Sequence, residues 1–104
     1  MIKGKEIELG GTVYVVPPLN LAAVEFFQDR LSNFTGGADL QSVTLVAEVT
    51  LSALKRNYPD MTLEKVKELI DLGNMVEVFQ AVMQVSGFVM RTDGLGELIA
   101  PASN

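Results

Sequence analysis

The chain contains no cysteine and no histidine. The absence of cysteine excludes disulfides, thiolate catalysis and most zinc sites. The absence of histidine removes the side chain that most often transfers protons near neutral pH. Glycine motifs that bind phosphate, of the forms GxxxxGKS/T and GxGxxG, are also missing. Together these absences predict a protein that is not an enzyme and that holds no cofactor or metal.

Basic residues are few and scattered. The chain has 8 lysines and arginines against 13 acids, for a formal net charge of -5. Proteins that bind duplex nucleic acid neutralise phosphates with clustered basic residues, so nucleic acid is not an expected partner.

Long apolar runs are missing as well. No run approaches the roughly 20 apolar residues that a membrane-spanning helix needs, so no membrane association is expected. The first segment, MIKGKEIELGG, lacks the apolar middle region of a secretory signal. The cytoplasm is therefore the expected location.

Apolar residues are nevertheless abundant, at 48% of the 104 residues. A chain of this length supports one domain with a modest core. We expect a single helical domain over residues 1–90. Residues 91–104 are rich in turn-forming and polar residues, and we expect them to be a flexible tail.

Turn and cap residues predict a β-hairpin followed by helices. Gly10-Gly11 separates two short strand-like stretches and suits a primed two-residue turn, which predicts a hairpin over residues 5–16. Residues suited to an N-cap precede four later segments; they are Asn20, Asp39, Thr62 and Asn74. The predicted helices cover residues 21–33, 39–57, 63–72 and 75–86. The expected fold is mainly α, an N-terminal β-hairpin followed by a compact bundle of about four helices.

Two of these helices are apolar around most of their circumference. In residues 39–57 and 75–86 the apolar arc covers roughly two-thirds of the helix, whereas an ordinary surface helix has an arc of a little over 100°. Glu48 lies in the polar stripe of the helix predicted over residues 39–57, and we expect it to be a solvated carboxylate. Asn74, with Glu77 three residues later, predicts a capping box at the start of the helix over residues 75–86. Phe26 lies off the buried stripe of the predicted helix 21–33, and we expect it at the edge of the core, with an exposed anchor as the alternative.

A chain of about 100 residues has little material with which to cover two such helices. We therefore expect an apolar patch that serves self-association or holds a partner chain. A compact monomer with a rich core is the alternative. The candidate contact surface is the last helix with the residues after it, namely Val78, Phe79, Val82, Met83, Val85, Phe88 and Met90.

The order of certain segments resembles a known family. These segments are YVVPPLNL at residues 14–21, PDMTLEKV at 59–66, LIDLGN at 69–74 and an apolar last helix that ends in Ser86-Gly87. Over residues 12–88 the chain is similar to the small tail assembly chaperones of long-tailed bacteriophages, the siphovirus type.

The resemblance implies a non-enzymatic protein that acts in the cytoplasm of the infected host and is absent from the finished virion. It implies binding to the tape-measure protein, recruitment of tail-tube subunits, and self-association into a homo-oligomer. Two alternatives remain open. The chain could be a structural component of a phage tail or head–tail connector, or a small bacterial helical adaptor protein.

Overall fold

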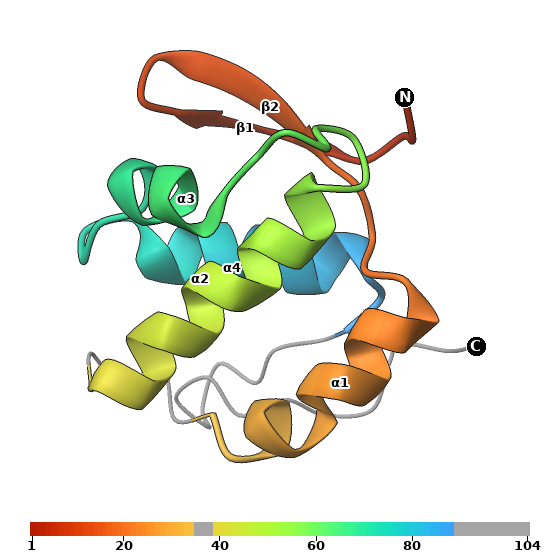
Figure 1. Ribbon diagram of the computed structural model, residues 1–104, viewed down its shortest axis with the longest axis vertical. Coiled ribbons are helices and arrows are strands. Elements are labelled where there is room, and N and C mark those ends of the chain that lie inside the picture. Colours follow the sequence, from red (N-terminus) through yellow and green to blue (C-terminus); the bar gives the residue numbers. More distant parts are fainter. Residues whose placement is uncertain (35–38, 89–104) are drawn as a thin grey trace.

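The computed structural model describes residues 1–34 and 39–88, and within them a β-hairpin precedes four helices (Figure 1). The strands are β1 (Lys5–Leu9) and β2 (Thr12–Val16). The helices are α1 (Leu21–Ser32), α2 (Leu40–Leu54), α3 (Leu63–Leu69) and α4 (Met75–Val85). The predicted mainly α fold with an N-terminal hairpin is confirmed. Residues 91–104, predicted to be a tail, lie outside the described residues.

The hairpin has the predicted turn and pairing. Gly10 and Gly11 have φ angles of 60° and 82°. A type I′ turn requires positive φ at both central positions, and glycine adopts it without steric strain. Leu9 therefore pairs with Thr12, and Ile7 pairs with Tyr14 two positions further along.

All four helices begin directly after the predicted cap residues, and three of them have the predicted side-chain cap. The side chains of Asn20, Asp39 and Thr62 each accept a hydrogen bond from the backbone N–H three residues on, at 2.8, 3.2 and 3.1 Å. Each bond satisfies an amide that the first turn of a helix leaves free. The predicted boundaries at these helix starts are therefore confirmed.

Asn74 is the exception, because its side chain makes no cap bond at α4. Its Oδ1 instead accepts from the N–H of Asp71 at 2.8 Å, and its Nδ2 donates to the carbonyl of Leu69 at 3.2 Å. Asn74 thus braces the turn between α3 and α4. The predicted capping box with Glu77 is wrong, because the asparagine side chain is already occupied by the preceding turn.

Helices α2 and α3 end earlier than predicted. After Leu54 the backbone tightens, and the N–H of Asn57 bonds to the carbonyl of Leu54 at 3.0 Å, three residues back. Pro59 follows shortly after and disfavours helical backbone at Tyr58. Helix α3 stops at Leu69 because Ile70 is already extended, with φ -105° and ψ 131°.

The core lies between α2 and α4, which pack against each other (Figure 1). Helices α1 and α3 cover further sides of α2, and both strands of the hairpin lie against α4. The most deeply buried apolar side chains of the two central helices are Val46, Val49, Ala53, Leu54, Phe79, Val82 and Met83. The two helices with wide apolar arcs therefore cover each other, and the hairpin, α1 and α3 cover much of what remains.

Candidate protein-binding surfaces

Four of the seven predicted contact residues are in the core. Val78, Phe79, Val82 and Met83 are all buried, and even Val78 is only 3% exposed. Val85 and Phe88 are half-buried and pack against the core, while Met90 lies outside the described residues. The expectation that α4 presents the four buried side chains at the surface is wrong. A partner could reach them only if α4 left its place in the core.

Helix α4 is enclosed because α2 and both strands of the hairpin pack around it. The ring of Phe79 lies 4.5 Å from that of Phe34, centroid to centroid. The side chains that α4 does expose form a narrow stripe of Val76, Glu77, Gln80 and Gln84. The width of the apolar arc thus reflects several neighbours within the chain.

The Ser-Gly pair at the end of α4 has a structural role. The N–H of Phe88 bonds to the carbonyl of Met83 at 2.9 Å, and the N–H of Gly87 bonds to that of Gln84 at 3.1 Å. With Gly87 at φ 93°, these bonds form a Schellman motif. The hydroxyl of Ser86 accepts from the N–H of Leu19 at 2.9 Å. The pair therefore ends α4 and ties it to the segment before α1.

Apolar side chains reach the surface elsewhere. Leu21 and Phe26 are exposed on α1, and Leu40 is exposed at the start of α2. Leu72 and Val76 are exposed on either side of the start of α4. These five side chains are candidates for apolar contact with another protein. The N-terminal segment and the hairpin also expose apolar side chains, namely Met1, Ile2 and Val13.

Phe26 is 73% exposed, so the expected place at the edge of the core is wrong and the alternative of an exposed position is confirmed. Helix α1 packs mainly against one neighbour, α2. Successive residues of an α-helix point about 100° apart, so burying Phe27 on that side turns Phe26 away from the core. Phe27 is buried, and the two rings meet edge to face at 5.0 Å between centroids. The fold therefore leaves an aromatic ring on the outer side of α1.

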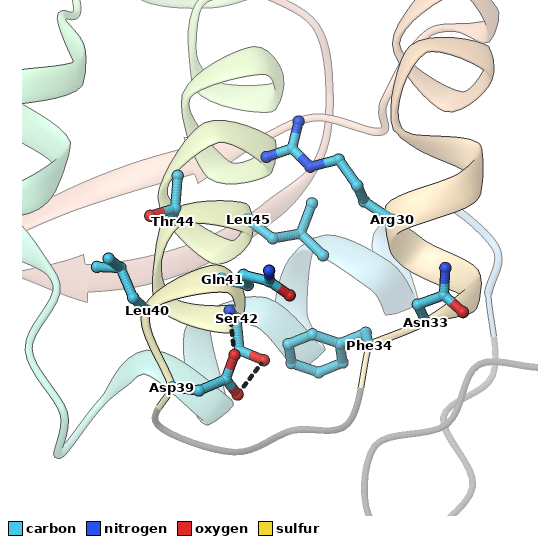
Figure 2. Close-up of a pocket in the computed structure, with 9 residues that line it drawn as sticks. All are labelled: Arg30, Asn33, Phe34, Asp39, Leu40, Gln41, Ser42, Thr44 and Leu45. Atoms are coloured by element: carbon cyan, nitrogen blue, oxygen red, sulfur yellow. Dashed lines mark hydrogen bonds between the residues drawn. The ribbon is translucent and has the colours of Figure 1, made fainter.

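A pocket of about 550 Å³ lies between the end of α1 and the start of α2 (Figure 2). Arg30 and Asn33 border it from the α1 side, and Gln41 and Leu45 border it from α2. The remaining lining residues are Phe34, Asp39, Leu40, Ser42 and Thr44.

The polar groups of this pocket bond to one another. The Ser42 hydroxyl donates to Asp39 Oδ1 at 2.9 Å, the shorter of the two bonds drawn in Figure 2. Hydrogen bonds from the side chain and the backbone N–H of Ser42 lower the pKa of Asp39. The chain has no histidine to activate the serine. The arrangement is therefore that of a helix cap.

The sequence predicts Glu48 to be a solvated carboxylate in the polar stripe of α2, and its side chain is partly exposed there. The structure adds an ion pair with Arg30 that the sequence does not predict. Arg30 Nη2 donates to Glu48 Oε1 at 2.6 Å, and the two side chains are 44% and 32% exposed. Exposed ion pairs of this kind contribute about 0.2–1 kcal/mol. The pair links α1 to α2, and its modest strength agrees with a position in the polar stripe.

Asn57 and Tyr58 hold the N-terminal segment against the end of α2. Tyr58 Oη accepts from the N–H of Val15 at 2.8 Å, and Asn57 Nδ2 donates to the carbonyl of Val15 at 3.1 Å. Asn57 also bonds to both the N–H and the carbonyl of Ile2, at 2.7 and 2.8 Å. The partners are 42 to 55 positions apart, so no local pattern in the sequence predicted these contacts.

Within residues 1–34 and 39–88, no group of three or more histidine, cysteine or acidic residues could hold a metal ion. No helix in the same part of the chain is long and apolar enough to cross a membrane. Comparisons of the chain with protein-family models, curated proteins and solved structures found no match. Function must therefore be inferred from the chain's own residues.

Proposed function

We propose that the chain is a non-enzymatic tail assembly chaperone of a long-tailed bacteriophage. In this role it binds the tape-measure protein in the host cytoplasm and helps to recruit tail-tube subunits to it. The proposal is supported by the sequence resemblance over residues 12–88 and by the apolar side chains that the fold leaves exposed.

The exposed ring of Phe26 is the observation that carries the proposal. Burying a side chain of this size stabilises a protein or a complex by about 1.5–3 kcal/mol, and this gain is largely unused in the isolated chain. Leu21 is exposed on the same helix. Apolar anchors on a helix surface are suited to contact with the apolar stripe of a long helical partner.

The segments that carry the resemblance lie at element boundaries. Pro17 and Pro18 follow the last residue of β2, and Asn20 caps α1. Thr62 caps α3, and Ser86 is the C-cap of α4. In this chain these segments therefore mark where the hairpin and the helices begin and end. We therefore place the partner contacts on the exposed residues between these boundaries.

Co-expression with the tape-measure protein encoded in the same genome tests the proposal. We expect the tape-measure protein to be insoluble alone, and to become soluble and co-purify when this chain is present. If it stays insoluble beside abundant soluble chain, the proposal is wrong. Light scattering over a range of concentrations tests the accompanying proposal of a homo-oligomer, which a strictly monomeric species would contradict.

A pair of substitutions on α1 tests the contact itself. Phe26→Gln removes the exposed ring, and we expect it to reduce the amount of tape-measure protein recovered in solution. Gln28→Ala changes another exposed residue of the same helix and should leave that amount unchanged. Circular dichroism checks that both variants remain folded. Equal recovery with both variants would show that Phe26 is not part of the contact.

A further inference from the structure

The two outer edges of the hairpin are chemically different. Leu9 and Thr12 flank the two-residue turn and form a hydrogen-bonded pair, and such pairs alternate along an antiparallel ladder. It follows that Glu6 and Glu8 in β1 direct their backbone N–H and C=O groups away from β2. By the same alternation, Val15 in β2 directs its backbone groups away from β1.

The edge of β2 is closed at Val15, because Tyr58 and Asn57 bond to the N–H and the carbonyl of that residue. Val13, the other outward-directed residue of β2, has no such partner among residues 1–34 and 39–88. The edge of β1 is open. Outside the ladder between β1 and β2, the backbone N–H and C=O groups of Glu6 and Glu8 have no hydrogen-bond partner among residues 1–34 and 39–88. An edge of this kind is a template for another strand.

The open edge borders an acidic groove of about 680 Å³ between the hairpin and α4. Glu6 and Glu8 line it from the strand, and Glu77 lines it from the helix. Lys5 also lines the groove, but its Nζ donates to Gln84 Oε1 at 3.0 Å and so is already engaged with α4. The groove therefore favours a positively charged occupant.

The charges disfavour the two occupants that this chain could supply. Antiparallel pairing of β1 with β1 of a second copy, centred on Ile7, would place Glu6 opposite Glu8 in two like-charge pairs, which destabilise a sheet. The sequence after residue 88 contains one basic residue, Arg91, beside the acids Asp93 and Glu97. Neither β1 nor the sequence after residue 88 contains basic residues at alternate positions.

We infer that the edge of β1 binds an extended segment of another protein by strand addition, with lysine or arginine at alternate positions opposite Glu6 and Glu8. Backbone hydrogen bonds to these two residues supply affinity, and the acidic side chains select the basic segment. This site is separate from the exposed residues of α1, and the inference does not depend on the tape-measure protein being the partner.

The direct test is titration of the full chain, labelled with ¹⁵N, with the peptide acetyl-TKVKVKT-amide. We expect shifts and slowed hydrogen exchange at the amides of Glu6 and Glu8, with no protection gained at Val13 on the opposite edge. Absence of binding up to about 1 mM peptide would overturn the inference. Protection of the β1 amides by dimerisation without peptide would also overturn it, because the occupant would then be a second copy.

Methylated peptides separate strand addition from simple charge attraction. N-methylation of alternate residues removes either the amides that face β1 or those that face away from it, and the net charge stays the same. Because strand pairing uses one set only, we expect one peptide to lose binding and the other to retain it. Equal binding by both would contradict strand addition.

Charge reversal tests the selectivity. We expect Glu6→Lys combined with Glu8→Lys to weaken binding of the basic peptide about tenfold and to favour acetyl-TEVEVET-amide instead. Glu25→Lys combined with Glu68→Lys changes the net charge by the same amount, at exposed positions on α1 and α3. The basic peptide should bind this control nearly as well as the wild type. An equal loss in the control would mean that net charge, and not the edge of β1, determines binding.

Discussion

Thr50 gives the sharpest test of the core, because its side chain is 0% exposed on α2. Its Oγ1 has no hydrogen-bond partner among the described residues. Burying a hydroxyl without a partner costs about 1–3 kcal/mol on scales derived from protein mutants. Valine has nearly the same shape and helix propensity. We therefore expect Thr50→Val to stabilise the protein, although most core substitutions destabilise.

The expected gain is about 1–2 kcal/mol in the free energy of unfolding, since the penalty of the buried hydroxyl is removed and one methyl group is added to the core. For a domain of this size, each kcal/mol corresponds to a rise of about 4–8 °C in Tm. Urea unfolding followed by circular dichroism measures the change. The m-value should not change, because the surface exposed on unfolding is the same.

Val49→Thr is the matched control, because Val49 is the preceding residue and is also 0% exposed. It adds the hydroxyl that Thr50→Val removes, and we expect it to lower stability by about 1–3 kcal/mol. A Thr50→Val protein that is no more stable than the wild type would refute the reasoning. The Thr50 hydroxyl would then have a partner in solution, such as a buried water or the carbonyl of Val46 one turn earlier.

Three further predictions concern other contacts. Asn57→Ala removes three hydrogen bonds and should lower the free energy of unfolding by about 2 kcal/mol in urea titrations, and a change under about 0.5 kcal/mol would count against it. Val82→Asp places a charge at a fully buried site and should destabilise by about 4 kcal/mol or more, whereas Glu48→Gln should change stability by under about 1 kcal/mol. Because the folded-state pKa of Asp39 is lowered, its carboxylate stabilises the fold above the unfolded-state pKa of about 3.9, and this contribution is lost as the pH falls through the folded-state value. The stability of the wild type relative to Asp39→Asn should therefore shrink as the pH is lowered from about 5 through and below the unfolded-state value, and a constant difference would contradict the role of the charge.

The hairpin and the helix starts were predictable because their determinants are local. Gly10-Gly11 sets the turn, and a two-residue turn sets the register of both strands. The caps Asn20, Asp39 and Thr62 act on amides three residues away. Asn74 has the same residue type but bonds backward into the preceding turn. Its role depends on a competing local geometry, which residue type alone does not reveal.

The candidate contact surface could not be placed in the same way. Periodicity showed that α4 is apolar on most sides, but it contains no information on how many neighbours the helix has. The buried Val82 and the exposed Phe26 have comparable apolar character in the sequence and opposite environments in the structure. Which edge of the hairpin stays open likewise depends on the tertiary structure, because Tyr58 lies on the edge of β2 and not on that of β1.

The sequence by itself determined the elements of this protein, that is, where the hairpin turns, where each helix begins, and that α2 and α4 need cover on several sides. These features depend on residues within about four positions of one another. Only the tertiary structure decided which surfaces remain free. Burial and edge protection arise from contacts such as Asn57 with Ile2, 55 positions apart, and these depend on how the whole chain packs.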